Sequence, residues 1–243
     1  GAGAEATVTI IGVGGTGTQY ANGISLNNGN IISAAGGALT ISGTGGTGNS
    51  GYNNGVAIYN ATYGPAITNS NGGSISITGS AGNGVSSYGI MTQSLSVMNA
   101  NSGNFTLTAD TVTLAGTLSG KGSLTIKPLN SGVTVGIGGE TGTLQLTAAN
   151  FSTQFTDGFS SITVGDANTG KITAAAFSPK DNITLQSGSD GIELTGALSL
   201  ASDATTVTLN STGSVTNTGS GAITAANLAL LGEDGAFTLD STS

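Results

Sequence analysis

Leu39-Thr40-Ile41 is one copy of a three-residue pattern, apolar–polar–apolar, that decides the fold of this 243-residue chain. Alternation of this kind places the two apolar side chains on one face of a β-strand and the polar side chain on the other. The pattern recurs at Val8-Thr9-Ile10, Leu39-Thr40-Ile41, Ile75-Ser76-Ile77, Phe105-Thr106-Leu107, Leu124-Thr125-Ile126, Leu144-Gln145-Leu146, Ile192-Glu193-Leu194, Val207-Thr208-Leu209 and Phe237-Thr238-Leu239. Repeats at intervals of about 20 to 50 residues are typical of architectures whose turns are each too small to bury a core alone.

The composition is that of a folded and nearly uncharged β protein. Only 7% of the residues are charged, whereas about 25% is usual in soluble proteins. No Asp, Glu, Lys or Arg occurs between residues 6 and 109. The net charge of −8 disfavours nucleic acids and anionic membrane surfaces as partners, because both attract Lys and Arg. The chain has no cysteine and no apolar run long enough to span a membrane, so we expect no disulfides and no membrane insertion of this segment.

The first hundred residues divide into three long turns, each with three predicted strands. The predicted strands are Thr7–Ile10, Gly23–Leu26 and Asn30–Ser33, then Leu39–Ile41, Gly55–Ile58 and Ala66–Thr68, then Ser74–Thr78, Gly89–Met91 and Leu95–Met98. The stretches between them are rich in Gly and Asn, which tolerate the positive φ of tight corners.

We therefore predict an all-β fold: a parallel β-helix, or β-solenoid, with three strands per turn and about eleven turns of about 22 residues each. We expect a single continuous β-helix over 1–243, with long uncharged turns in the sub-region 1–100 and shorter turns with scattered charges in 101–243. The segments 148–156 and 225–231 depart from period two and predict short helical turns. An antiparallel β-sandwich is the alternative, but it requires regular hairpin signals between its strands.

The residues needed for common catalytic sites are missing. Without His and Cys the chain cannot form a Ser-His-Asp triad, a Cys-His pair or a usual zinc site. Two glycine sets have the spacing of a dinucleotide-binding fingerprint, but no helix pattern follows either, so we assign them to corner loops. They are Gly12, Gly14 and Gly17, and Gly43, Gly45 and Gly48.

A polysaccharide lyase or hydrolase is a less favoured alternative. It needs two acids close together, and stacked turns would bring Asp157 near Asp181 or Asp166 near Asp190, but the chain has no Arg to bind an acidic sugar. We predict no enzyme activity, no catalytic, cofactor-binding or metal-binding residues, and no cofactor.

The outward hydroxyl groups of the first strand in each turn predict a flat Thr/Ser array. Such an array resembles the ice-contacting faces of β-solenoid antifreeze proteins, although Thr is also simply favoured on the wet face of a strand. Lys127 and Gln145 interrupt it. Its members are Thr7, Thr9, Thr40, Ser42, Ser74, Ser76, Thr78, Thr106, Thr108 and Thr125.

All the tyrosines lie in the uncharged part of the chain, beside the Gly-rich corners. Their rings are suited to stacking on sugar rings, and equally to covering cavities at the corners. These candidate glycan-stacking residues are Tyr20, Tyr52, Tyr59, Tyr63 and Tyr88.

Three phrases, Leu114–Ile126, Asp157–Gly165 and Ala225–Gly232, resemble the repeat regions of filamentous-haemagglutinin-type exoproteins, which include two-partner-secreted and autotransporter-like adhesins of Gram-negative bacteria. The resemblance implies a right-handed β-helix, a secreted or cell-surface location reached by Gram-negative-type export, and little or no cysteine. It supplies no catalytic residues.

These observations lead us to expect a structural or adhesive repeat segment of a large extracellular bacterial surface protein: a stalk, a filament or an adhesin. Gly1 and Ser243 both fall inside repeat-like sequence, so we expect the chain to be part of a longer protein. The expected partners are glycans, a host or neighbouring cell surface, and other copies of the chain stacked end to end. An ice-binding β-solenoid is the alternative function.

Overall fold

The computed structural model describes residues 7–27, 32–34, 36–59, 67–69, 71–93, 97–201 and 203–240. The chain forms two compact units, Gly1–Leu124 and Thr125–Ser243. Almost every regular element is a short β-strand, and the strand pairings between them are parallel. The predictions of an all-β fold and of parallel sheets are therefore confirmed, and the antiparallel β-sandwich is excluded.

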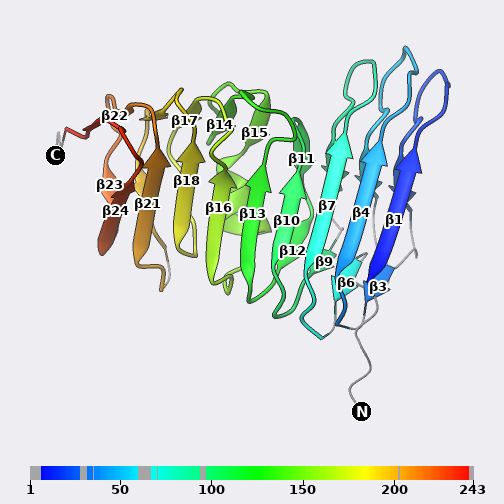
Figure 1. The fold of residues 1–243 in the computed structure, drawn as a ribbon, viewed down its shortest axis with the longest axis horizontal. Helices are drawn as coiled ribbons and strands as arrows, with labels where there is room; N and C mark the ends of the chain where they lie inside the picture. The colour runs from blue at the N-terminus through cyan, green and yellow to red at the C-terminus, as the bar shows by residue number, and fades with distance from the viewer. Residues whose placement is uncertain are drawn as a thin grey trace. The chain divides into compact units, whose positions relative to one another are not determined.

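In the first unit, every third strand along the chain joins the same sheet. One sheet has the order β1-β4-β7-β10, another β2-β5-β8-β11 and the third β3-β6-β9-β12. Figure 1 shows β1, β4 and β7 side by side, each leading into a long loop at the top. The bounds are β1 (Val8–Val13), β2 (Ile24–Leu26), β3 (Ile32–Ala34), β4 (Leu39–Thr44), β5 (Val56–Ile58), β6 (Ile67–Asn69), β7 (Ile75–Ser80), β8 (Ile90–Thr92), β9 (Val97–Asn99), β10 (Phe105–Thr108), β11 (Val112–Leu114) and β12 (Thr117–Ser119).

The pairing in this unit stacks like residues on like residues. Leu39 pairs with Ile75, and Ile75 with Phe105; one step further, Ile41 pairs with Ile77. All these side chains are fully buried. The alternation seen in the sequence therefore produces continuous apolar rows inside the unit, and each turn buries the apolar surface of the next.

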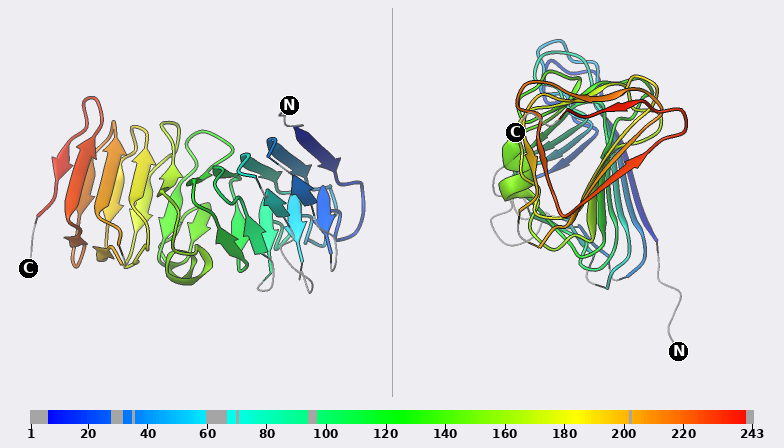
Figure 2. Two further views of the ribbon diagram at one scale, coloured as in Figure 1. Left: turned by 90° about the horizontal axis from the view of Figure 1, so that it is seen from below. Right: turned by 90° about the vertical axis from the view of Figure 1, so that its left-hand side faces the viewer.

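The second unit also stacks parallel strands, but every third strand joins the same sheet only from β18 onward. Its first sheet has the order β13-β16-β18-β21-β24, a second sheet has the order β15-β14-β17-β19-β22-β25, and β20 pairs with β23. Figure 2 (right) looks at this unit from its C-terminal end and shows the yellow to red chain coiling around a triangular outline. The bounds are β13 (Ser123–Lys127, which spans the boundary), β14 (Val135–Ile137), β15 (Leu144–Leu146), β16 (Ser161–Gly165), β17 (Ile172–Ala174), β18 (Ile183–Ser187), β19 (Ile192–Leu194), β20 (Leu198–Ser199), β21 (Thr206–Ser211), β22 (Val215–Asn217), β23 (Ile223–Thr224), β24 (Asn227–Leu231) and β25 (Phe237–Thr238).

Earlier in this unit, β14 and β15 are consecutive and parallel within one sheet. The short connection between them crosses the outer side of β14 at Gly136, where a Cβ atom would collide with the carbonyl oxygen of Glu140. Only a residue without a side chain lets the connection pass so closely. The triplet Leu144-Gln145-Leu146 therefore belongs to the second sheet, not to the first.

The two predicted helical turns have different outcomes. A π-helical turn, η1 (Asn150–Gln154), lies inside the segment 148–156, and its Phe151 ring packs against Phe155 and Phe177 at centroid distances of 5.4 and 4.7 Å. The prediction for 225–231 is wrong, because β24 occupies this segment. There Leu228 pairs with Val207 and Leu230 with Leu209, so the strand extends the apolar rows of β21 and its backbone is paired in the sheet.

Glycines at the end of the first strand of each turn explain the repeated fingerprint-like spacing. A Cβ atom at Gly12, Gly43 or Gly79 would collide with the carbonyl oxygen of Gly23, Gly55 or Gly89, respectively. These glycines therefore let two segments of backbone pass in direct contact where the chain leaves the first sheet. The assignment of the two sets to corner loops is correct for Gly14, Gly17, Gly45 and Gly48, whereas Gly12 and Gly43 lie on β1 and β4.

Replacing Gly43 by Ala is expected to lower the free energy of unfolding by about 2 kcal/mol, because the new methyl group meets backbone that cannot yield. Gly15 is the matched control, since a Cβ atom there would meet nothing within 4 Å. Its replacement by Ala is expected to change the free energy by less than about 1 kcal/mol. Chemical denaturation followed by circular dichroism measures both. Equal effects at the two positions would contradict the close-contact explanation.

Candidate functional site

The predicted hydroxyl array of the first unit forms two outward rows in register. Thr9, Thr40, Ser76 and Thr106 pair in one row, and Ser42, Thr78 and Thr108 in the next. Thr7 and Ser74 lie directly before β1 and β7, and Thr125 lies on β13. On β1 the second row is occupied by Ile11, which, like Val13, is 74% exposed.

The sequence analysis missed a further row of outward hydroxyl groups, which lies in the second unit. Thr163, Thr184 and Thr208 pair in register on β16, β18 and β21. The signal was present, because Thr163 and Thr184 also stand between apolar residues. The predicted interruption by Gln145 is wrong, since Gln145 lies on β15 in another sheet. Lys127 does lie on β13, where its ammonium group is 3.2 Å from the Asp166 carboxylate.

A second candidate site is the set of loops that follow β1, β4 and β7. Backbone hydrogen bonds hold the loops in register: Tyr20 N–H donates to the Gly51 carbonyl, and Tyr52 N–H to the Val85 carbonyl. The equivalent positions in the three loops are Tyr20, Tyr52 and Ser86, whose φ angles are all positive, at 58°, 57° and 53° respectively. For residues other than glycine this conformation costs about 1–2 kcal/mol each, so the surrounding contacts must hold it.

A ladder of amide groups supplies those contacts. The Asn53 side chain is fully buried: its amide nitrogen donates to the carbonyls of Gly48 and Asn83 at 2.7 Å, and its oxygen accepts from Ala21 N–H at 2.9 Å. Asn54, also buried, accepts from Tyr88 N–H at 2.9 Å. Buried amides without partners are costly, so this fully bonded ladder fixes the loops and the tyrosines they carry.

The tyrosines gather on one side of these loops. The rings of Tyr20 and Tyr52 stack with centroids 5.2 Å apart and planes 15° apart, and the Tyr59 hydroxyl accepts a hydrogen bond from the Asn22 amide at 3.3 Å. Tyr20, Tyr52, Tyr59 and Tyr88 line one hollow of about 340 Å³, together with Asn54, Ser86, Met91 and Gln93. Tyr63 lies outside the described residues. The structure thus brings four of the predicted tyrosines together.

A second hollow adjoins the first. Tyr20, Asn22, Ser25, Asn27 and Tyr59 line it, and its volume is about 390 Å³. Tyr20 and Tyr59 line both hollows. No residue of either lining carries a formal charge at neutral pH, as expected from the uncharged stretch 6–109. This arrangement suits a neutral ligand with apolar ring faces and polar edges.

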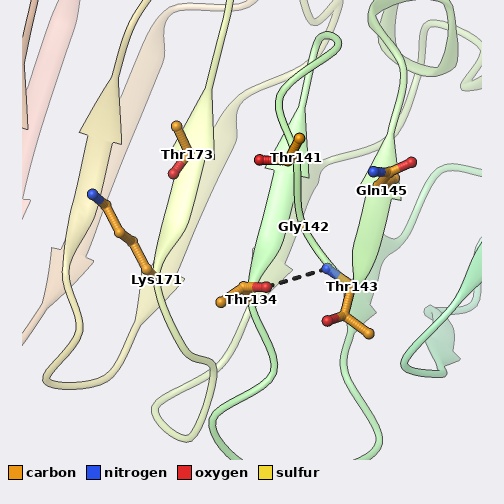
Figure 3. Close-up of a pocket in the computed structure, with 7 residues that line it drawn as sticks. All are labelled: Thr134, Thr141, Gly142, Thr143, Gln145, Lys171 and Thr173. Atoms are coloured by element: carbon orange, nitrogen blue, oxygen red, sulfur yellow. Dashed lines mark hydrogen bonds between the residues drawn. The ribbon is translucent and has the colours of Figure 1, made fainter.

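The second unit has a hollow of a different kind, of about 420 Å³. Figure 3 shows it between Lys171 and Thr173 on one side and Gln145 on the other, with Thr141, Gly142 and Thr143 of the β14–β15 connection across it. Thr143 N–H donates to the Thr134 hydroxyl at 3.2 Å. The Lys171 ammonium lies 2.6 Å from the Glu193 carboxylate, so its charge is already paired.

The acid pairs considered for a hydrolase differ in their surroundings. Burial raises the pKa of Asp181, and the charge of Asp157 raises it further, although a hydrogen bond of 3.0 Å from Gly158 N–H opposes this. One Asp181 carboxyl oxygen is buried without a hydrogen-bond partner. Burial alone would raise the pKa of Asp166. Hydrogen bonds from Asn168 N–H, Lys127 and Thr169 outweigh that effect and hold its pKa below the ordinary value.

Among the residues that the structure describes, no three His, Cys, Asp or Glu side chains cluster so as to hold a metal ion. Over the same residues, no helix is long and apolar enough to cross a membrane. Comparison of the chain with protein-family models, with curated proteins and with solved structures finds no match.

Replacing Asp181 by Asn is expected to raise the free energy of unfolding at pH 7. A carboxyl group whose pKa is raised by folding stabilises the fold fully below its ordinary value of 3.8 and loses that contribution as the pH rises through the higher pKa of the folded state. The advantage of the variant should therefore grow from pH 3.5 to pH 7. Denaturation curves across this pH range measure it. An advantage that is constant with pH would contradict the buried-charge explanation.

Proposed function

We propose that this chain is a structural and adhesive repeat segment of a large extracellular surface protein: a stalk, a filament or an adhesin. The observation that carries the proposal is the in-register stacking of turns, which repeats neutral outer surfaces along the first unit. Such stacking lengthens a protein and multiplies its surface without a new core for each step. The resemblance to filamentous-haemagglutinin-type exoproteins supports the same function and a secreted or cell-surface location reached by Gram-negative-type export.

The finer architecture belongs to this proposal. A right-handed β-helix of about eleven turns, at about 4.8 Å per turn, extends about 50 Å. Right-handed connections are strongly favoured between parallel strands of one sheet. The three-strand periodicity of the first unit supports this architecture.

The expected partners are glycans or cell surfaces, with end-to-end association as a further mode. Leu228 and Leu230, which continue the apolar rows of β21, are 45% and 41% exposed on β24. Exposed apolar rows of this kind favour contact with matching rows, whether these belong to a following turn or to another copy. We propose no enzyme activity, since the composition lacks His, Cys and Arg.

Beads coated with the chain are expected to be retained on cell layers or polysaccharide-coated surfaces above the level of uncoated beads. Beads coated with the heat-unfolded chain serve as the control, because retention should depend on the stacked surface. The same polysaccharides should show no new reducing ends after incubation with the chain. Absence of retention on every surface, or turnover of a polysaccharide, would overturn the proposal.

Ice binding is the second candidate, and the paired rows of Thr and Ser on parallel strands favour it. Ile11 on β1 breaks the second row, which weighs against an ice-binding face across this sheet. Thermal hysteresis separates the two functions: we expect none for the wild-type chain at high concentration. Hysteresis that disappears in a Thr40→Lys variant, but persists in an Asn49→Lys variant on an exposed loop, would favour ice binding instead.

A further inference from the structure

The three stacked loops of the first unit carry an aromatic ladder that stops after two members. Their equivalent positions hold Tyr20, Tyr52 and Ser86, with nearly equal positive φ values. Since successive loops lie one turn apart, Tyr52 stands between the other two. Tyr20 stacks on one face of the Tyr52 ring, at 5.2 Å. On the other side of that ring the ladder continues with a serine at the equivalent position.

A hollow lies beside this stack, and both stacked rings line it together with Ser86 and Tyr59. Tyr52 and Ser86 both line it, with Tyr88 and Met91 as further walls and Asn54 and Gln93 as polar groups. Its volume of about 340 Å³ is large enough for a single ring-sized ligand. Tyr52 is 44% exposed. The site is therefore an aromatic platform with a wall of mixed polarity, and the amide ladder beneath holds it in place.

The chemistry of the walls indicates the ligand. A sugar ring has a C–H face that packs on an aromatic ring and hydroxyl groups at its edge that bond to amides and hydroxyls. No charged residue occurs between residues 6 and 109, so nothing in this lining would pair with a carboxylate or sulfate on an acidic sugar. We propose that a neutral pyranose residue binds in this hollow, stacked on the exposed ring of Tyr52.

The adjoining hollow extends the site. Tyr20 and Tyr59 line both hollows, and Ser25, Asn22 and Asn27 add hydroxyl and amide groups to the second. A glycan of more than one unit can therefore contact both hollows, with the shared tyrosines between its units. This inference deepens the proposed adhesive function by naming the class of glycan, and it rests on that function only for its biological setting.

Ser86→Tyr is the decisive variant, because it completes the ladder and fills the hollow from within. Ser86→Gly is the matched control, since glycine accepts the same positive φ and leaves the hollow open. Tyr52→Ala removes the platform. Titration calorimetry and NMR titration use the full chain with unbranched neutral hexasaccharides of glucose, mannose and galactose, and with an acidic oligogalacturonate for contrast. Denaturation curves report whether each variant is folded.

We expect at least one neutral hexasaccharide to bind and the oligogalacturonate to bind at least about tenfold more weakly. Ser86→Tyr should fold normally and lose binding by more than about tenfold, Tyr52→Ala should lose about tenfold, and Ser86→Gly should stay within about threefold of the wild type. Failure of every neutral sugar to bind, or unchanged binding in a folded Ser86→Tyr variant, would overturn the inference. Bead retention without sugar binding would leave the adhesive function standing, whereas sugar binding without retention would leave this site standing and overturn that function.

Discussion

In-register parallel pairing between successive turns is the constraint on which the rest of the structure depends. Leu39 pairs with Ile75, and Ile75 pairs with Phe105. Apolar side chains therefore stack on apolar side chains in the interior, and hydroxyl side chains stack on hydroxyl side chains on the outer surface. A slip of one residue would turn each apolar row toward solvent. The same pairing repeats the glycines at the corners, since Gly12, Gly43 and Gly79 must all leave room for backbone in the next sheet.

The stacked loops of the first unit extend this rule beyond the strands. Side-chain amides add to the backbone hydrogen bonds between these loops: Asn53 alone bonds three backbone groups of its own and neighbouring loops. Once the loops are fixed in register, a side chain at one position is repeated a turn later, which is how Tyr20 comes to stack on Tyr52. The row ends at Ser86, which holds the position equivalent to the two tyrosines and lines the hollow beside them.

The strand positions of the first unit could be predicted closely, because period-two alternation and Gly-rich corners are local signals. Residues 225–231 show the limit: their spacing suggested a helical turn, and only pairing with β21, a tertiary contact, makes them a strand. Gln145 was assigned to the wrong sheet because the short β14–β15 connection breaks the three-strand rhythm, and nothing local marks it except Gly136 beneath the crossing chain. The tyrosines were identified as a group, but their stacking and the opening beside Ser86 depend on loop register, which composition alone does not fix.

Spin-label distances along one outward row test the in-register stacking most directly, and the absence of cysteine makes such labelling free of background. Pairs of labels are introduced at Thr9 with Thr40, Thr9 with Ser76, and Thr9 with Thr106, which lie one, two and three strands apart in the sheet. Since each step is about 4.8 Å, dipolar broadening should be strongest for the first pair and decrease in steps to the third, at about 14 Å. Equal broadening for all three pairs, or the strongest broadening for the last, would contradict stacking in register and with it the rows, the ladder and the site that depend on it.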